Sequence, residues 1–76
     1  MPNFTKIKAY NRYDSTTLVV IYLNINYVIS LSEIVDSKQT WYRVNLIDDS
    51  YTIPKVSYDY LVTLLYGKEY EDGKNN

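Results

Sequence analysis

The sequence contains no cysteine and no histidine among its 76 residues. Without cysteine the chain cannot form a disulfide or a thiolate metal site. Without histidine it lacks the usual ligand of zinc and haem, and also the side chain that most often transfers protons near neutral pH. We therefore expect no metal and no cofactor, and catalysis by a Ser–His or Cys–His pair is excluded.

Glycine is almost as scarce, since the chain has only Gly67 and Gly73, both near the C-terminus. A phosphate-binding loop needs closely spaced glycines between a strand and a helix, so none is predicted. Asp48 and Asp49 are adjacent carboxylates, but neighbouring residues of a turn point apart and no further cation ligands follow in order. We interpret this pair as a turn, and we expect a protein that is not an enzyme.

Long apolar runs and a dominant charge are also lacking. No run reaches the ~18 residues of a membrane span. The nearest, residues 18–34, is interrupted by two asparagines, two serines and a glutamate. The N-terminus does not have the pattern of a secretory signal, so we expect a cytoplasmic protein that does not bind membranes. The net charge of −1 provides no general basic field for nucleic acid.

Tyrosine, by contrast, is abundant, with ten residues in the chain. A tyrosine ring can be half buried while its hydroxyl reaches water, which suits strands and interfaces. The codon usage of an AT-rich genome would produce the same excess, so both explanations stay open. Because a single small domain without disulfides gains stability from a partner chain, we also consider a homodimer.

The first half of the chain predicts two strands. In Phe4–Tyr10, the side chains of Lys6 and Lys8 point one way, while Ile7 and Ala9 point the other, which indicates a strand with one wet face. Residues 16–23, TTLVVIYL, are apolar on both faces. That pattern is typical of a central strand covered on both sides, by the C-terminal helix and by a second copy of the protein.

Three more strands are predicted after this point. Tyr27–Ile34 alternates until a bulge near Glu33, and Thr40–Ile47 alternates throughout. The turn at 48–50 then leads into a short strand at 51–53, which Pro54 ends because proline has no N–H to donate.

A single helix is predicted to follow. Ser57 is a favourable N-cap residue, and an apolar stripe runs through Tyr58, Leu61, Val62 and Leu65 at helical spacing. Gly67 stands where a C-cap glycine is expected. The sequence thus predicts an α+β domain over residues 1–67, a small antiparallel curved sheet of four to five strands with one C-terminal helix. A flexible polar tail is expected over 68–76.

The candidate binding residues lie on the strand at 40–47. Tyr42, Val44 and Leu46 are expected to face the core. The opposite face presents an indole beside a guanidinium, a combination used in protein hot spots and in single-stranded nucleic acid binding. An alternative is that the indole covers a second hydrophobic layer. The predicted binding residues are Trp41, Arg43 and Asn45, together with Lys6 and Lys8 if their strand lies next to this one.

The order of these elements resembles the small bacterial β-rich proteins of the flagellar FlbD type. The resemblance is carried by Leu23-Asn24, by Tyr27–Ser30, by Trp41–Leu46 and by Tyr51–Ile53, followed by the short helix. That family usually has a Thr-x-Ile-x-Leu strand and an Asn-Gly turn, whereas this chain has Tyr42–Leu46 and Asp48–Ser50. The layout also looks like single-strand DNA-binding folds of the transcriptional-coactivator type. In size and composition the chain is similar to phage and mobile-element inhibitors, including anti-CRISPR proteins.

These observations predict a non-enzymatic protein-interaction module, an inhibitor or adaptor encoded by a phage or mobile element that binds a host protein. One alternative is binding of single-stranded nucleic acid or a nucleotide through Trp41 and Arg43. Another is a structural homodimer of the flagellar-accessory type, which would bury the second face of residues 16–23.

Overall fold

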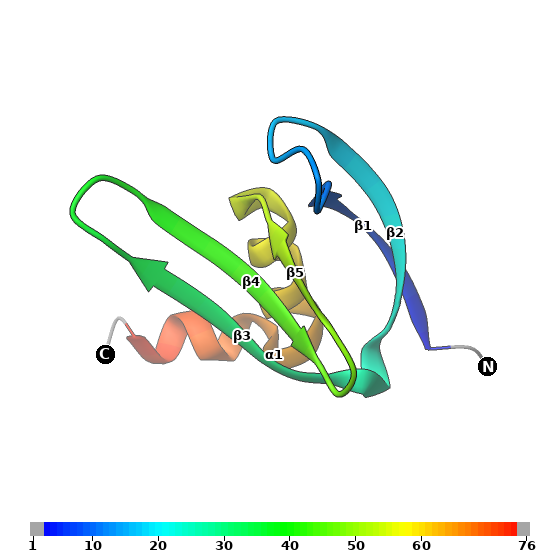
Figure 1. Ribbon diagram of the computed structural model, residues 1–76. Coiled ribbons are helices and arrows are strands. Elements are labelled where there is room, and N and C mark those ends of the chain that lie inside the picture. The colour runs from blue at the N-terminus through cyan, green and yellow to red at the C-terminus, as the bar shows by residue number, and fades with distance from the viewer. Residues whose placement is uncertain (1–2, 75–76) are drawn as a thin grey trace.

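The computed structural model describes residues 3–74, with side chains described as far as Gly67. It confirms the α+β class and the order of five antiparallel strands and a C-terminal helix (Figure 1). The elements are β1 (Phe4–Tyr10), β2 (Leu18–Asn24), the 3-10 turn η1 (Ile25–Tyr27), β3 (Val28–Val35), β4 (Thr40–Leu46), β5 (Ser50–Ile53) and α1 (Lys55–Lys74).

The strands form two sheets where the sequence predicted one. β1 and β2 make a two-stranded hairpin, and β3, β4 and β5 make a three-stranded sheet. β1 lies beside β5 without a ladder between them. β5 is only four residues long and ends at Ile53, directly before Pro54, so it offers little backbone for a further ladder. As Figure 1 shows, the hairpin curves away from the larger sheet, and α1 lies behind the three strands.

β2 differs from its prediction as a strand covered on both faces. It is an edge strand, since β1 is its only ladder partner within residues 3–74. Leu23 on its inner row is buried, while Leu18, Val20 and Tyr22 on its outer row are exposed. β2 is thus apolar on both faces, as predicted, but one of those faces is open to solvent.

β3 also departs from the predicted pattern. The bulge expected near Glu33 lies at Ile29, because the register with β4 shifts between Val28 and Ser30. Ile29 is exposed, while Val28 and Leu31 pack against the core on either side of it. The bulge moves the inward positions by one residue, so the uninterrupted alternation predicted from Tyr27 to Glu33 is wrong.

The core lies between the inner faces of the strands and α1. The inward positions predicted for β1 and β4 are confirmed, and the rings of Tyr42 and Tyr58 tilt against each other with centroids 4.6 Å apart. Val62 on the predicted helix stripe is buried as well. The central cluster is made of Ile7, Ala9, Leu23, Val44, Ile53 and Leu61.

The start of α1 is organised differently from its prediction. The helix begins at Lys55, and the carbonyl of Pro54 accepts hydrogen bonds from the N–H groups of Ser57 and Tyr58, each 3.0 Å long. Ser57 is therefore inside the helix, and its predicted role as N-cap is wrong. Its buried hydroxyl donates instead to the carbonyl of Lys8 on β1, at 2.8 Å.

Gly67 interrupts α1, close to the predicted end of the helix. Its φ of 76° and ψ of 176° place it in a region of backbone space that essentially only glycine occupies. Helical backbone resumes after it and continues to Lys74. A flexible tail was predicted over residues 68–76. The structure describes the backbone of 68–74 as helical, while residues 75–76 lie outside the described residues. The flexibility of the tail therefore stays a prediction.

Replacing Leu61 tests the role of the helix in the core. Leu61 is fully buried, so Leu61→Ala leaves a cavity and should lower the free energy of unfolding by about 2–5 kcal/mol. Urea denaturation followed by circular dichroism measures this loss. Thr63→Ala, at an exposed position on the same helix, is the control. Equal stability of the two variants would contradict the packing described above.

Replacing Ser57 tests the bond between helix and hairpin. Ser57→Ala removes the donor to the Lys8 carbonyl and should lower the free energy of unfolding by about 1–3 kcal/mol, the usual effect of an unpaired buried acceptor. If Ser57 acted as an N-cap, Ser57→Asp would preserve stability. We expect Ser57→Asp to be less stable than Ser57→Ala, because it places a charge at a buried position.

Candidate functional site

A cleft of about 620 Å³ lies beside the predicted binding residues Trp41 and Arg43. One wall is the outer face of β4 and β5, and the other is the loop between β1 and β2, residues 11–17. We call this site the Trp41 cleft. Its principal lining residues are Tyr10, Arg12, Gln39, Trp41, Arg43 and Thr52.

The turn between β3 and β4 fixes the indole of Trp41. Its Nε1 donates to Asp36 Oδ2 at 3.4 Å, while Asp36 Oδ1 accepts from the backbone N–H groups of Lys38 at 2.7 Å and Gln39 at 2.9 Å. These bonds, first the one from Lys38, lower the pKa of Asp36. Trp41 remains 39% exposed, so part of its ring is open to a ligand.

Arg43 is exposed on the same face of β4, two residues after Trp41. Its neighbours in register are Ser32 on β3 and Thr52 on β5, which carry no charge. Among the residues with described side chains, no carboxylate forms an ion pair with it. Arg43 thus brings an uncompensated positive charge to the wall of the cleft.

Asn45 shares this face but is already engaged. Its side-chain amide donates to the hydroxyls of Ser30 at 3.0 Å and Ser32 at 2.9 Å, both on the neighbouring strand β3. The three residues form a polar link across the sheet next to the bulge at Ile29. Asn45 is not among the lining residues of the cleft.

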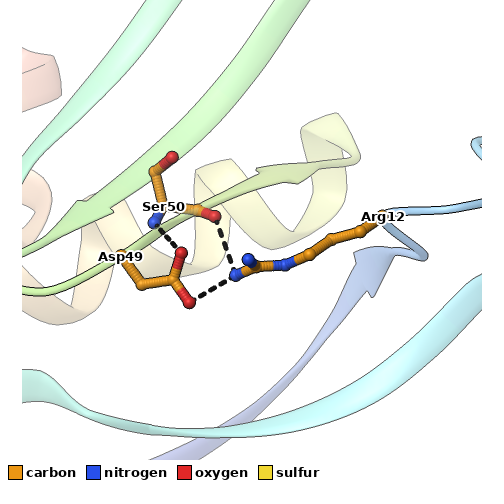
Figure 2. Close-up of polar contacts among 3 residues, drawn as sticks. All are labelled: Arg12, Asp49 and Ser50. Atoms are coloured by element: carbon orange, nitrogen blue, oxygen red, sulfur yellow. Dashed lines mark hydrogen bonds and ion pairs between the residues drawn. The ribbon is translucent and has the colours of Figure 1, made fainter.

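Arg12 is the cleft residue that the sequence did not single out as a binding residue. Its guanidinium pairs with the carboxylate of Asp49 and donates to the Ser50 carbonyl at 3.3 Å, as Figure 2 shows. It also lies over the ring of Tyr51, 4.6 Å from the centroid. The hydrogen bond from Arg12 to the Asp49 carboxylate is the main cause of the lowered pKa of Asp49. Arg12 therefore ties the β1–β2 loop to the turn before β5.

The β1–β2 loop is shaped by its own short-range bonds. Asp14 accepts from the hydroxyls of Thr16 at 2.6 Å and Thr17 at 2.7 Å, and from the Thr16 N–H at 3.1 Å. These bonds, first the one from the Thr16 hydroxyl, lower the pKa of Asp14. The Asn11 side chain accepts from the N–H of Tyr13 at 2.8 Å. The loop is thus a structured wall for the cleft.

Lys6 and Lys8 are not in the Trp41 cleft. They lie on the solvent side of β1, as predicted, and line a separate groove of about 360 Å³ with Val56 and Tyr60 of α1. The hydroxyl of Tyr60 shares a 2.7 Å hydrogen bond with that of Thr5. The structure therefore divides the predicted binding residues between two surfaces.

The second of these surfaces continues onto β2. In the hairpin register Lys6 is opposite Tyr22 and Lys8 is opposite Val20. Tyr22 is 71% exposed, Phe4 59% and Val20 50%. We call this face the hairpin surface; it consists of Phe4, Lys6, Lys8, Leu18, Val20 and Tyr22.

The two surfaces differ in the chemical groups that they present. Within the described residues there is no group of three or more carboxylates that could hold a metal ion. The described helical segments include none that is long and apolar enough to cross a bilayer. The cleft offers an indole, a guanidinium, amides and hydroxyls, while the hairpin surface offers apolar side chains and two ammonium groups.

Comparison with known proteins finds no matching family, no similar curated protein and no similar solved structure. The resemblance to FlbD-type proteins therefore stays a prediction.

The Arg12–Asp49 pair predicts a dependence of stability on pH. The pKa of Asp49 is lower in the folded protein than its ordinary value of about 4. The stabilisation is therefore complete above that ordinary value and is lost as the pH falls through the lower, folded pKa. Asp49→Asn should have a lower melting temperature than the wild type near neutral pH, and the difference should shrink in strong acid.

Thermal unfolding at several pH values, followed by circular dichroism, measures this effect. Asp48→Asn is the matched control, because Asp48 is the neighbouring exposed carboxylate and does not bond to Arg12. A difference between wild type and Asp49→Asn that stays constant down to about pH 2 would show that the pair does not contribute through its charge.

Proposed function

We propose that the protein is a non-enzymatic binding module that docks onto another protein through its hairpin surface. The observation that carries this proposal is the uncovered apolar row of Phe4, Leu18, Val20 and Tyr22 along a two-stranded sheet. Contiguous exposed apolar residues on a small protein mark interaction sites. An isolated hairpin is also only marginally stable, so a partner that covers it stabilises the fold.

The edge of β2 supports a particular way of docking. β2 has no ladder partner on the side away from β1, and its sequence, LVVIYLN, contains no charge and no proline. Lysine, proline and bulges are the usual features that prevent a free edge from pairing. An extended segment of a partner can therefore add to β2 as a further strand and place apolar side chains against Val20 and Tyr22.

The two lysines on the hairpin surface indicate the chemistry of the partner. Lys6 and Lys8 lie directly opposite Tyr22 and Val20, so a partner that covers the apolar row meets two positive charges at its border. A face-to-face homodimer would bring the lysines of both copies together, which is unfavourable. The partner that fits is a different protein with an apolar segment flanked by acidic residues.

The biological role that follows is that of an inhibitor or adaptor. A binding module without catalytic groups acts by covering a surface of its partner or by holding it next to another molecule. An origin in a phage or mobile element is consistent with this mode of action and rests on size and composition alone.

Affinity capture with paired tyrosine variants tests the proposal. The wild type, Tyr22→Ala and Tyr13→Ala are used as bait, and titration calorimetry with the purified partner follows. Tyr13 is the matched control, because it is 96% exposed in the β1–β2 loop, outside the hairpin surface. Tyr22→Ala should weaken binding by about tenfold or more, the usual loss at an interface hot spot, and Tyr13→Ala should not.

Three further results complete this test. Lys6→Ala combined with Lys8→Ala should slow association and reduce its dependence on salt. Equal binding by Tyr22→Ala and the wild type would contradict docking at the hairpin surface. A dimer found by sedimentation equilibrium, and converted to a monomer by Val20→Glu, would contradict a different partner protein. It would show that a second copy of the chain covers the hairpin surface.

A further inference from the structure

The Trp41 cleft has a positive charge that the fold does not use. Of its two arginines, Arg12 is neutralised by Asp49, whereas Arg43 has no ion pair among the described side chains. Among the lining residues that the structure describes, Asp49 alone has a carboxylate, and Arg12 occupies it. The charge available to a ligand is therefore one guanidinium, and it suits one anionic group such as a phosphate or a carboxylate.

The same face provides a platform for a planar ring. Trp41 is held at its Nε1 edge by Asp36 and is partly exposed to the cleft. An indole fixed at one edge keeps its face available for stacking, and every nucleobase has a π-face that can use it. Trp41 and Arg43 are alternate residues of one strand, so their side chains leave the sheet on the same side, about two residue rises or 7 Å apart.

The remaining wall of the cleft adds hydrogen-bonding groups. Gln39 brings a side-chain amide, and Ser15 and Thr52 bring hydroxyls that can bind a sugar or the edge of a base. The volume of about 620 Å³ falls within the usual range for small-molecule sites. The cleft is thus large enough for one ring, one sugar and one charged group.

From this arrangement we infer that the Trp41 cleft binds a single nucleoside phosphate unit, with the base stacked on Trp41 and the phosphate on Arg43. One indole and one free guanidinium match one nucleotide. The net charge of −1 for the whole chain disfavours a long polyanion, whose binding needs many phosphate contacts. This site is distinct from the hairpin surface and does not depend on the function proposed for it.

The chain carries its own probe for this binding, because Trp41 is its only tryptophan. Trp41 fluorescence is titrated with adenosine monophosphate, adenosine and inorganic phosphate. We expect saturable quenching by the monophosphate, at least about tenfold weaker binding of adenosine, and no quenching by phosphate alone. The affinity should fall as the salt concentration rises, because salt screens the contact between the phosphate and the exposed Arg43 guanidinium.

Variants assign the binding to the two residues. Arg43→Ala should weaken binding of the monophosphate by about tenfold or more. The affinity of Arg43→Lys should lie between those of the wild type and Arg43→Ala, because an ammonium keeps the charge but loses the bidentate geometry. Lys55→Ala is the matched control, since it removes one positive charge at an exposed position outside the cleft. For Trp41→Phe, calorimetry replaces fluorescence and should show weaker binding.

Competition with other ligands distinguishes a free nucleotide from a nucleotide within a single strand and from an acidic peptide. A short oligothymidylate that competes with the monophosphate and binds more tightly would identify the nucleotide unit as part of a single strand. No saturable quenching by the monophosphate, or equal quenching in Arg43→Ala and the wild type, would overturn the inference. Displacement by an acidic peptide at lower concentration than by any nucleotide would overturn it as well and assign the cleft to a protein ligand.

Discussion

The fold depends on the packing of α1 against strands of both sheets. Because no ladder joins β1 to β5, the two sheets are held together by side chains, and Leu61 and Ser57 are central among them. Leu61 is part of the same buried cluster as Ile7 of β1 and Val44 of β4. The Ser57 hydroxyl ties the first turn of the helix to the backbone of β1. In a single sheet, continuous hydrogen bonding between strands would hold the two parts together. Here the packing of α1 against both sheets holds them together.

The position of the cleft depends on the loop after β1, which stands opposite the outer face of β4 and β5. Arg12 spans this gap through Asp49, Ser50 and Tyr51. A cation bound to both a carboxylate and an aromatic ring gives the loop a fixed position, and that position makes the second wall of the cleft.

Sequence patterns predicted the elements well, because each element is encoded by neighbouring residues. The alternation of Lys6, Ile7, Lys8 and Ala9 gave the bounds and the inner face of β1, and the helical spacing after Pro54 gave the buried face of α1. The position of the bulge in β3 and the role of Ser57 were local errors, whereas the error at β2 concerns a relation between distant residues. An apolar strand such as β2 has the same local pattern in the centre of a sheet and at an edge, so its uncovered face could not be foreseen.

In the candidate site, too, features encoded by neighbouring residues were predicted and contacts between distant residues were not. The side of β4 that carries Trp41 and Arg43 follows from period-two alternation, and the structure places both residues on the wall of a cleft. Lys6 and Lys8 fall on another surface because β1 neighbours β5 and pairs with β2. Arg12 was beyond prediction, since its partner Asp49 is 37 positions away and nothing in either turn indicates the other.

The small core explains why so many large apolar side chains stay exposed on this molecule. With few fully buried side chains, most large apolar residues stay partly exposed, and tyrosine is suited to that position because its hydroxyl remains hydrated. The hairpin is attached to the core through Ile7 and Ala9 of β1 and through Ile21 and Leu23 on the inner row of β2. The outer row of Leu18, Val20 and Tyr22 stays exposed and is not part of the core, which leaves it available for the docking that we propose.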